Sequence, residues 1–102
     1  MIHIMVSLDL VNAESRRDGF YKLLAAKGWV KLGAVDTIWT FSKTGYTQHD
    51  ASQVEGEIAK LLTEAATEFV PTSISYVAQI GNNVAVERIV EKRDDHYGVF
   101  EV

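Results

Sequence analysis

Near its start the chain reads Ile2-His3-Ile4-Met5-Val6-Ser7-Leu8-Asp9, and every second side chain in this segment is aliphatic. An extended chain places alternate side chains on opposite faces, so the aliphatic residues at even positions share one face. This period of two predicts a strand that is buried on one side. His3 and Asp9 then lie on the opposite side, together with the other residues at odd positions.

A helix is expected directly after this strand, over residues 13–27. Asn12 is a suitable N-cap, and Phe20 and Leu24 recur at helical spacing. Gly28 can take the left-handed conformation that commonly ends a helix. The opening unit of the chain is therefore predicted to be a strand followed by a helix.

The next segment is rich in aromatic and β-branched residues, which favour extended structure. Gly33-Ala34 interrupts it, which predicts two strands, at residues 29–33 and 35–43, joined by a tight turn. A second helix is predicted over residues 51–67 and should end before Pro71. Its start is signalled by an apparent capping box, Asp50 with Gln53.

The remaining residues predict a strand at 73–80 and a last short strand at 97–102, while residues 84–90 fit a strand or a short helix equally well. The order β-α-β-β-α-β is that of a ferredoxin-like plait, an α+β fold whose two helices cover one face of an antiparallel sheet. We expect one such domain over residues 1–102. The open face favours a homodimer, in which the tail at 83–102 could exchange its strand between copies.

Composition excludes several classes of protein. The 102 residues contain no cysteine, which rules out a disulfide scaffold, a thiolate metal site and a cysteine nucleophile. No apolar run is long enough to span a membrane, and Met1-Ile2-His3-Ile4 lacks the basic leader of a signal peptide. We therefore expect a cytoplasmic domain with no membrane partner.

The net charge of −4 is unevenly distributed. Residues 1–50 carry a net charge of +1, and residues 51–102 carry −5. A surface that binds phosphate groups should therefore draw on the first half, while the acidic second half suits a protein partner.

Asp9 is the first candidate for chemistry, because it is a carboxylate at the end of an otherwise apolar strand. It could simply cap a loop backbone. Alternatively, two copies related by a twofold axis could together hold Mg²⁺, for which one carboxylate supplies too few ligands. Bound Mg²⁺ can activate water and stabilise charge on a phosphoryl group. On this hypothesis Asp9 is both the metal ligand and the catalytic residue, and metal chemistry requires the dimer.

Arg16 and Arg17 are the candidate nucleic-acid-binding residues. A guanidinium group matches phosphate oxygens well, although a solvated helix face is the simpler interpretation of either residue alone. His3, His49 and His96 do not have the spacing of a metal site. The aromatic residues Trp29, Trp39, Phe41 and Tyr76 are interpreted as core, with base stacking as the alternative.

Residues 4–9, the following helix with Arg17, and the segment Asp36-Thr37-Ile38-Trp39 together resemble the small CRISPR-associated adaptation proteins with a ferredoxin-like fold. Similar plaits occur in the endoribonuclease antitoxins of type V toxin–antitoxin systems and in virulence-associated D-type proteins. The likeness covers residues 2–42 in motif and 50–80 in element order. It implies a homodimer, a metal site of paired strand-end aspartates, and either RNA or DNA hydrolysis or structural nucleic-acid binding. By the motif, these roles would fall on Asp9 and Arg17.

Three hypotheses follow. The first is a dimeric protein of CRISPR-associated or toxin–antitoxin type that acts on nucleic acid and could be a Mg²⁺-dependent endoribonuclease. The second is a non-catalytic dimeric interaction or regulatory module, in which Asp9 is structural. The third is a plait that binds a small molecule, for which the sequence carries no pocket signature.

Overall fold

The computed structural model describes residues 1–33 and 37–102. Its strands are β1 (Ile2–Val11), β2 (Val30–Lys31), β3 (Ile38–Lys43), β4 (Ser73–Ile80), β5 (Val86–Arg93) and β6 (His96–Glu101). Its helices are α1 (Arg17–Ala26) and α2 (Ala51–Phe69), preceded by 3-10 turns at Glu14–Arg16 and Gln48–Asp50. The predicted turn at Gly33-Ala34 and the start of the strand predicted over 35–43 lie partly outside the described residues.

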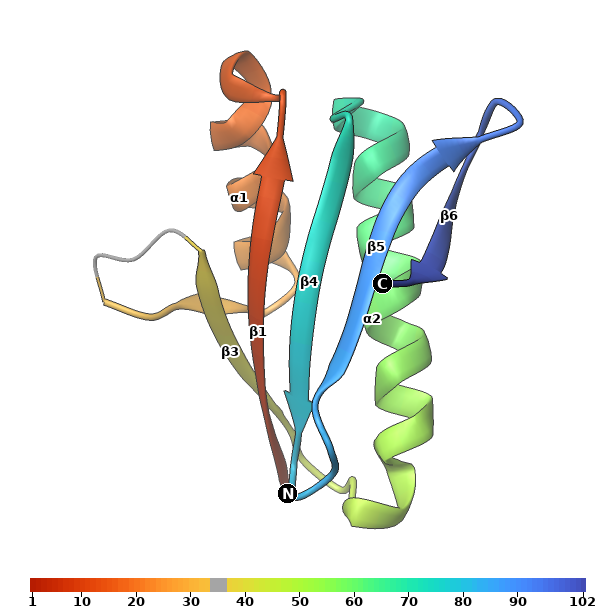
Figure 1. The fold of residues 1–102 in the computed structure, drawn as a ribbon. Coiled ribbons are helices and arrows are strands. Elements are labelled where there is room, and N and C mark those ends of the chain that lie inside the picture. The colour runs from red at the N-terminus through yellow and green to blue at the C-terminus, as the bar shows by residue number, and fades with distance from the viewer. Residues whose placement is uncertain (34–36) are drawn as a thin grey trace.

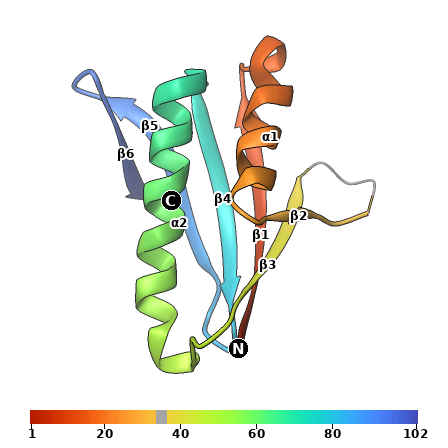
Figure 2. The same cartoon turned by 180° about the vertical axis from the view of Figure 1, so that it is seen from behind.

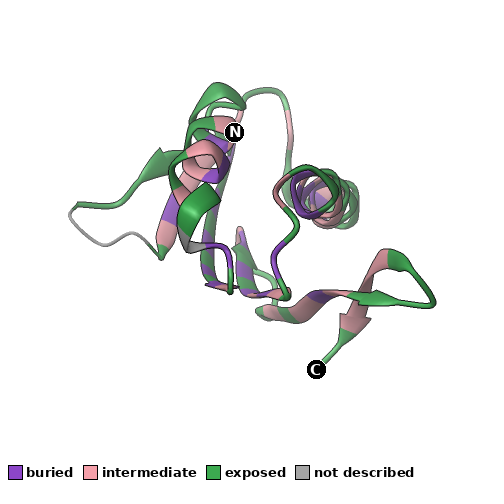
Figure 3. Ribbon diagram, turned by 90° about the horizontal axis from the view of Figure 1, so that it is seen from above, coloured by how far each residue is buried: buried purple, intermediate pink, exposed green. Residues whose placement is uncertain are grey.

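The strands form one antiparallel sheet in the order β2-β3-β1-β4-β5-β6. β1 is central and lies between β3 and β4 (Figure 1). Both helices cover the same face of the sheet, as Figures 2 and 3 show from behind and from above. The α+β class and the helices on one face agree with the sequence-based prediction, and the architecture is consistent with a ferredoxin-like plait.

The hydrophobic core lies between the sheet and the helices. Every second residue of β1 is buried there, from Ile2 to Leu10, and the residues between them are exposed. The helices contribute their apolar stripes, which include Phe20, Leu24, Val54, Ile58 and Leu62. The alternation predicted for the first strand is thus confirmed, and it fixes which side chains reach the open face.

The cap of the first helix was predicted wrongly. Helical structure starts close to the predicted residue 13, but as a 3-10 turn at Glu14–Arg16 that leads into α1 at Arg17, and no side chain caps either one. Asn12 has a φ of 57°, and its amide donates a 2.9 Å hydrogen bond to the hydroxyl of Thr72. Its side chain therefore joins two loops instead of capping a helix. The predicted left-handed glycine after the helix is confirmed, because Gly28 has a φ of 89°.

The second helix was placed correctly, but its cap was not. The hydroxyl of Thr47 accepts from the backbone N–H of His49 at 3.2 Å, and the carboxylate of Asp50 accepts from the N–H of Thr47 at 2.8 Å. The capping box therefore pairs Thr47 with Asp50, three residues earlier than predicted. The helix ends at Phe69, and the residue that caps it, Val70, has a φ of 49° and precedes Pro71.

The C-terminal residues form a hairpin, so the residues predicted as strand or short helix belong to strand β5. Asp94 and Asp95 connect β5 to β6 with φ values of 53° and 66°, as a two-residue type I′ turn requires. β5 pairs with β4, and β6 pairs with β5 of the same chain. Exchange of this strand between copies stays a prediction. No helix in the described part of the chain has the length and apolar character that crossing a membrane needs.

Candidate functional site

Asp9 lies on the face of the sheet that the helices leave uncovered. Its neighbour across the β1–β4 ladder is Ser75, and its side chain is exposed. Within the residues that the structure describes, the carboxylate makes no hydrogen bond and no ion pair. Its charge is therefore available to a ligand. The strand was predicted to end at Asp9, but β1 continues to Val11, because Leu10 and Val11 also pair with β4.

A shallow depression of about 410 Å³ surrounds Asp9. Its lining includes the hydroxyl-bearing residues Ser7, Thr37 and Ser75, with Val77 beside them. Carboxylate and hydroxyl oxygens are hard ligands of the kind that Mg²⁺ accepts. Asp9 and these hydroxyl groups are oxygen donors of that kind, and an ion bound by a single carboxylate needs further ligands.

Glu87 is a second carboxylate at this depression, and no sequence pattern singled it out. It lies in β5 opposite Val77 of β4, so it shares the open face with Asp9 across one intervening strand. Only the strand interpretation of residues 84–90 places it on this face. If residues 84–90 formed a helix instead, the sequence would not predict where Glu87 lies relative to Asp9.

Arg16 and Arg17 lie near the end of the molecule at which β1 stops and α1 starts (Figure 1). The side chain of Arg16 is exposed at the end of the 3-10 turn. Arg17 is half-buried, and its guanidinium donates to the backbone carbonyl of Leu10 at 3.5 Å, while its Nε is buried without a partner. The two arginines are thus close to β1, but neither contacts the carboxylate of Asp9.

The histidines are dispersed over the molecule. The Nδ1 atom of His3 lies 2.8 Å from the hydroxyl of Ser42 on the open face, whereas His49 lies in the turn before α2 and His96 at the C-terminal hairpin. In residues 1–33 and 37–102, no three side chains of the metal-binding types gather closely enough to hold an ion.

The aromatic residues belong to the helix side of the sheet. Trp29, Trp39 and Tyr76 are buried in the core, and Phe41 packs against it. This confirms the core interpretation. Base stacking on the open face by these residues is excluded, because their side chains point to the helices.

Tyr76 has a buried hydroxyl without a hydrogen-bond partner. Burial raises the pKa of this phenol, the neighbouring Arg88 guanidinium opposes the shift, and Glu55 adds to it. Arg88 lies 3.5 Å from Glu55 and 3.9 Å from Glu101, which links α2 to the C-terminal hairpin. Exposure makes such ion pairs weak, so this cluster is better suited to structure than to catalysis.

No protein-family model matches the chain, and no curated protein or solved structure matches it either. The functional argument therefore rests on the residues and geometry of the chain.

Proposed function

We propose that the chain acts on nucleic acid as a homodimer formed through the open face of its sheet, with Asp9 of both copies as the metal ligands. The observation that carries this proposal is the position of Asp9 on the central strand, exposed and unpaired among the described residues. The resemblance of residues 2–42 to the CRISPR-associated adaptation proteins points to the same residue. On this proposal the sheet is the core of a ferredoxin-like plait extended by the C-terminal hairpin.

A twofold axis near Asp9 doubles the ligands available to one ion. Two carboxylates, with nearby hydroxyls and water, supply the oxygen donors that a single chain lacks. Mg²⁺ bound there would supply activation of water and stabilisation of charge on a phosphate group. The chain itself supplies the carboxylates, and the rigid ladder between β1 and β4 fixes their position.

Phosphate contacts would come from Arg16 and, after a rotamer change, from Arg17. Arg16 is exposed and can reach a phosphate without breaking a contact that holds the fold. Both belong to the half of the chain that carries a positive charge balance. Residues 51–102 carry a net charge of −5, which makes that half of the chain a poor surface for nucleic acid.

A nuclease assay with the purified chain tests this proposal, using single- and double-stranded RNA and DNA with Mg²⁺ or Mn²⁺. We expect cleavage of RNA by the wild type and its loss in Asp9→Asn, which removes the charge at nearly constant size. Asp94→Asn is the matched control, because it makes the same charge change in a turn where asparagine also tolerates the positive φ. Equal activity in wild type and Asp9→Asn would refute the metal mechanism.

The second candidate function is a non-catalytic dimeric interaction module. It is favoured by two exposed apolar side chains on the open face, Met5 on β1 and Val77, which lines the depression at Asp9. Absence of cleavage together with a stable dimer would support this function. A binding measurement then shows whether such a non-catalytic dimer binds nucleic acid or a protein. If it contacts phosphates, the double variant Arg16→Ala/Arg17→Ala should weaken nucleic-acid binding and flatten its salt dependence.

A further inference from the structure

A separate cavity of about 330 Å³ lies on the helix side of the sheet, away from Asp9. α1 has 10 residues and α2 has 19, so α1 leaves part of this face to be covered by α2 alone. The residues that line the cavity come from the segment after α1, from β3 and from the middle of α2. Figure 2 shows how these elements are arranged. Its volume is at the lower end of the range for small-molecule sites.

The apolar wall of this cavity is an aromatic pair. Trp29 and Phe41 stack with their ring centroids 4.8 Å apart and an interplanar angle of 13°. The turn at Gly28 returns the chain to the sheet, and the N–H of Trp29 donates to the carbonyl of Leu24 at 3.1 Å, which holds the indole in place. Phe41 and Leu61 are only partly buried, so they retain apolar surface for a ligand.

Three lysines from three different elements surround the cavity: Lys27 after α1, Lys43 in β3 and Lys60 in α2. Two glutamates also line it, Glu57 and Glu64, which leaves one net positive charge in a chain whose net charge is −4. Within the described residues, Lys27 and Lys60 form no ion pair. The cavity is therefore a locally cationic site on an acidic protein.

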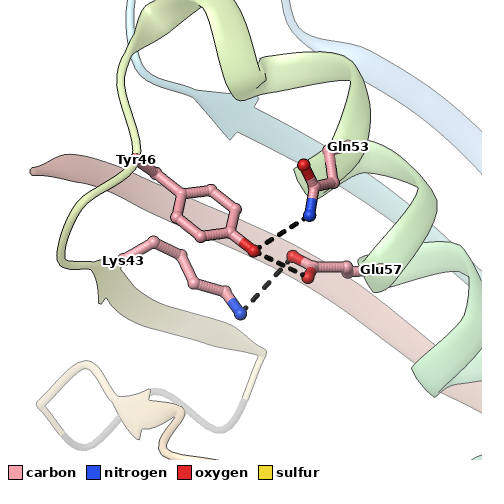
Figure 4. Close-up of polar contacts among 4 residues, drawn as sticks. All are labelled: Lys43, Tyr46, Gln53 and Glu57. Atoms are coloured by element: carbon pink, nitrogen blue, oxygen red, sulfur yellow. Dashed lines mark hydrogen bonds and ion pairs between the residues drawn. The ribbon is translucent and has the colours of Figure 1, made fainter.

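One of the glutamates is already neutralised and held (Figure 4). The carboxylate of Glu57 accepts from the hydroxyl of Tyr46 at 3.1 Å and lies 3.4 Å from the ammonium of Lys43. The amide of Gln53 donates to the same hydroxyl at 3.1 Å, and Lys43 also lies over the Tyr46 ring. This network holds two residues of the cavity lining, Lys43 and Glu57, in place, and it leaves Lys27 and Lys60 to meet an incoming charge.

We propose that this cavity binds a small organic anion with a flat apolar body, of the class of aromatic carboxylates and sulfonates. The apolar body lies against Phe41 and Leu61, and Lys27 and Lys60 hold the anionic group. The two requirements match the two kinds of surface found there: an aromatic wall, and two ammonium groups without an ion-pair partner whose charge exceeds that of Glu64 beside them by one. This site is independent of Asp9 and of the dimer.

Two dyes with the same aromatic framework test the proposal: anilinonaphthalene sulfonate, which is anionic, and phenylnaphthylamine, which is neutral. We expect saturable binding of one sulfonate dye per chain and much weaker binding of the neutral dye. Lys27→Gln and Lys60→Gln should each raise the Kd roughly threefold, and together roughly tenfold. Lys22→Gln, which changes an exposed α1 lysine outside the cavity, should leave the Kd unchanged.

A mapping experiment locates the dye. Addition of the sulfonate dye should shift the NMR signals of the Trp29 indole and the backbone amide of Leu61, and leave that of Ser75 on the open face in place. Circular dichroism of each variant checks that the dye is not reporting partial unfolding. Equal affinity of the neutral dye, or a Kd that the lysine substitutions do not change, would overturn the proposal.

Discussion

The hydroxyl of Tyr97 in β6 donates a 2.6 Å hydrogen bond to the carbonyl oxygen of Pro71, the residue that follows the left-handed end of α2. This bond ties the C-terminal hairpin to the connection between α2 and β4. Tyr76 lies in β4, and its buried hydroxyl, unlike that of Tyr97, has no hydrogen-bond partner. The two phenols therefore allow a hydroxyl that has a hydrogen-bond partner to be compared with one that has none.

Removal of the two hydroxyls should have different effects on stability. Tyr97→Phe breaks the bond to Pro71 and should lower the free energy of unfolding by about 1 kcal/mol. Tyr76→Phe removes a polar atom that is buried without compensation, so the free energy of unfolding should stay the same or rise by up to about 1 kcal/mol. Urea denaturation of both variants and the wild type measures this difference. A loss in Tyr76→Phe as large as that in Tyr97→Phe would mean that the Tyr76 hydroxyl has a partner in solution.

The same phenols predict a loss of stability at alkaline pH. Burial raises the pKa of both Tyr76 and Tyr97 above the ordinary value of 10.0. At a pH between the pKa of the unfolded chain and that of the folded chain, the unfolded chain releases the proton while the folded chain retains it. The unfolded state is therefore stabilised relative to the folded state. The stabilisation is therefore fully present below about pH 10 and is lost as the pH rises through the folded pKa. The free energy of unfolding should fall more steeply above this pH in the wild type than in Tyr76→Phe, and parallel curves would contradict the assignment to Tyr76.

Two helical glycines should respond oppositely to alanine. Gly56 in α2 has nothing within 4 Å of the position of an added Cβ, so Gly56→Ala should stabilise the protein by about 0.5–1 kcal/mol through helix propensity. At Gly19 in α1 the same atom would lie 2.8 Å from Cε1 of Phe69, so the ring must move. Gly19→Ala should therefore gain nothing or destabilise. Thermal unfolding compares the two, and equal gains would show that the Phe69 ring moves without cost.

The sequence predicted well where local pattern decides the structure. The alternation in β1 placed Asp9 on the open face, and β4 has the bounds 73–80 that were predicted. The sequence-based prediction failed where a residue distant in the sequence determines the local structure. Asn12 has the composition of an N-cap, but its side chain bonds to Thr72, 60 residues away. No local pattern contains that bond.

The same distinction explains which site residues were found. Asp9 stands out within its own strand, because it follows four aliphatic residues at even positions. Glu87 becomes notable only when β5 is paired with β4. The cationic cavity depends on Lys27, Lys43 and Lys60, which lie far apart in the sequence and come together only when β3 and the two helices pack in the fold.

The proposed dimer predicts that a charge at the centre of the open face will separate the subunits. Met5 lies on β1 between Thr40 and Gln79, and 45% of its surface is exposed in the single chain. In a dimer formed through this face its side chain would lose that contact with water, and an ammonium group in its place would be buried without a partner. Met5→Lys should therefore raise the dimer Kd by at least about tenfold, which is the equivalent of about 1.4 kcal/mol.

Sedimentation velocity over a range of concentrations measures this shift. Val84→Lys is the matched control, because Val84 is 90% exposed but lies in the loop before β5, outside the strands of the open face. It makes the same change of charge and should leave the dimer intact. A wild type that stays monomeric at every concentration would remove the paired Asp9 site. Dissociation of both variants alike would instead place the interface elsewhere, because a charge outside the open face would then be as disruptive as one at its centre.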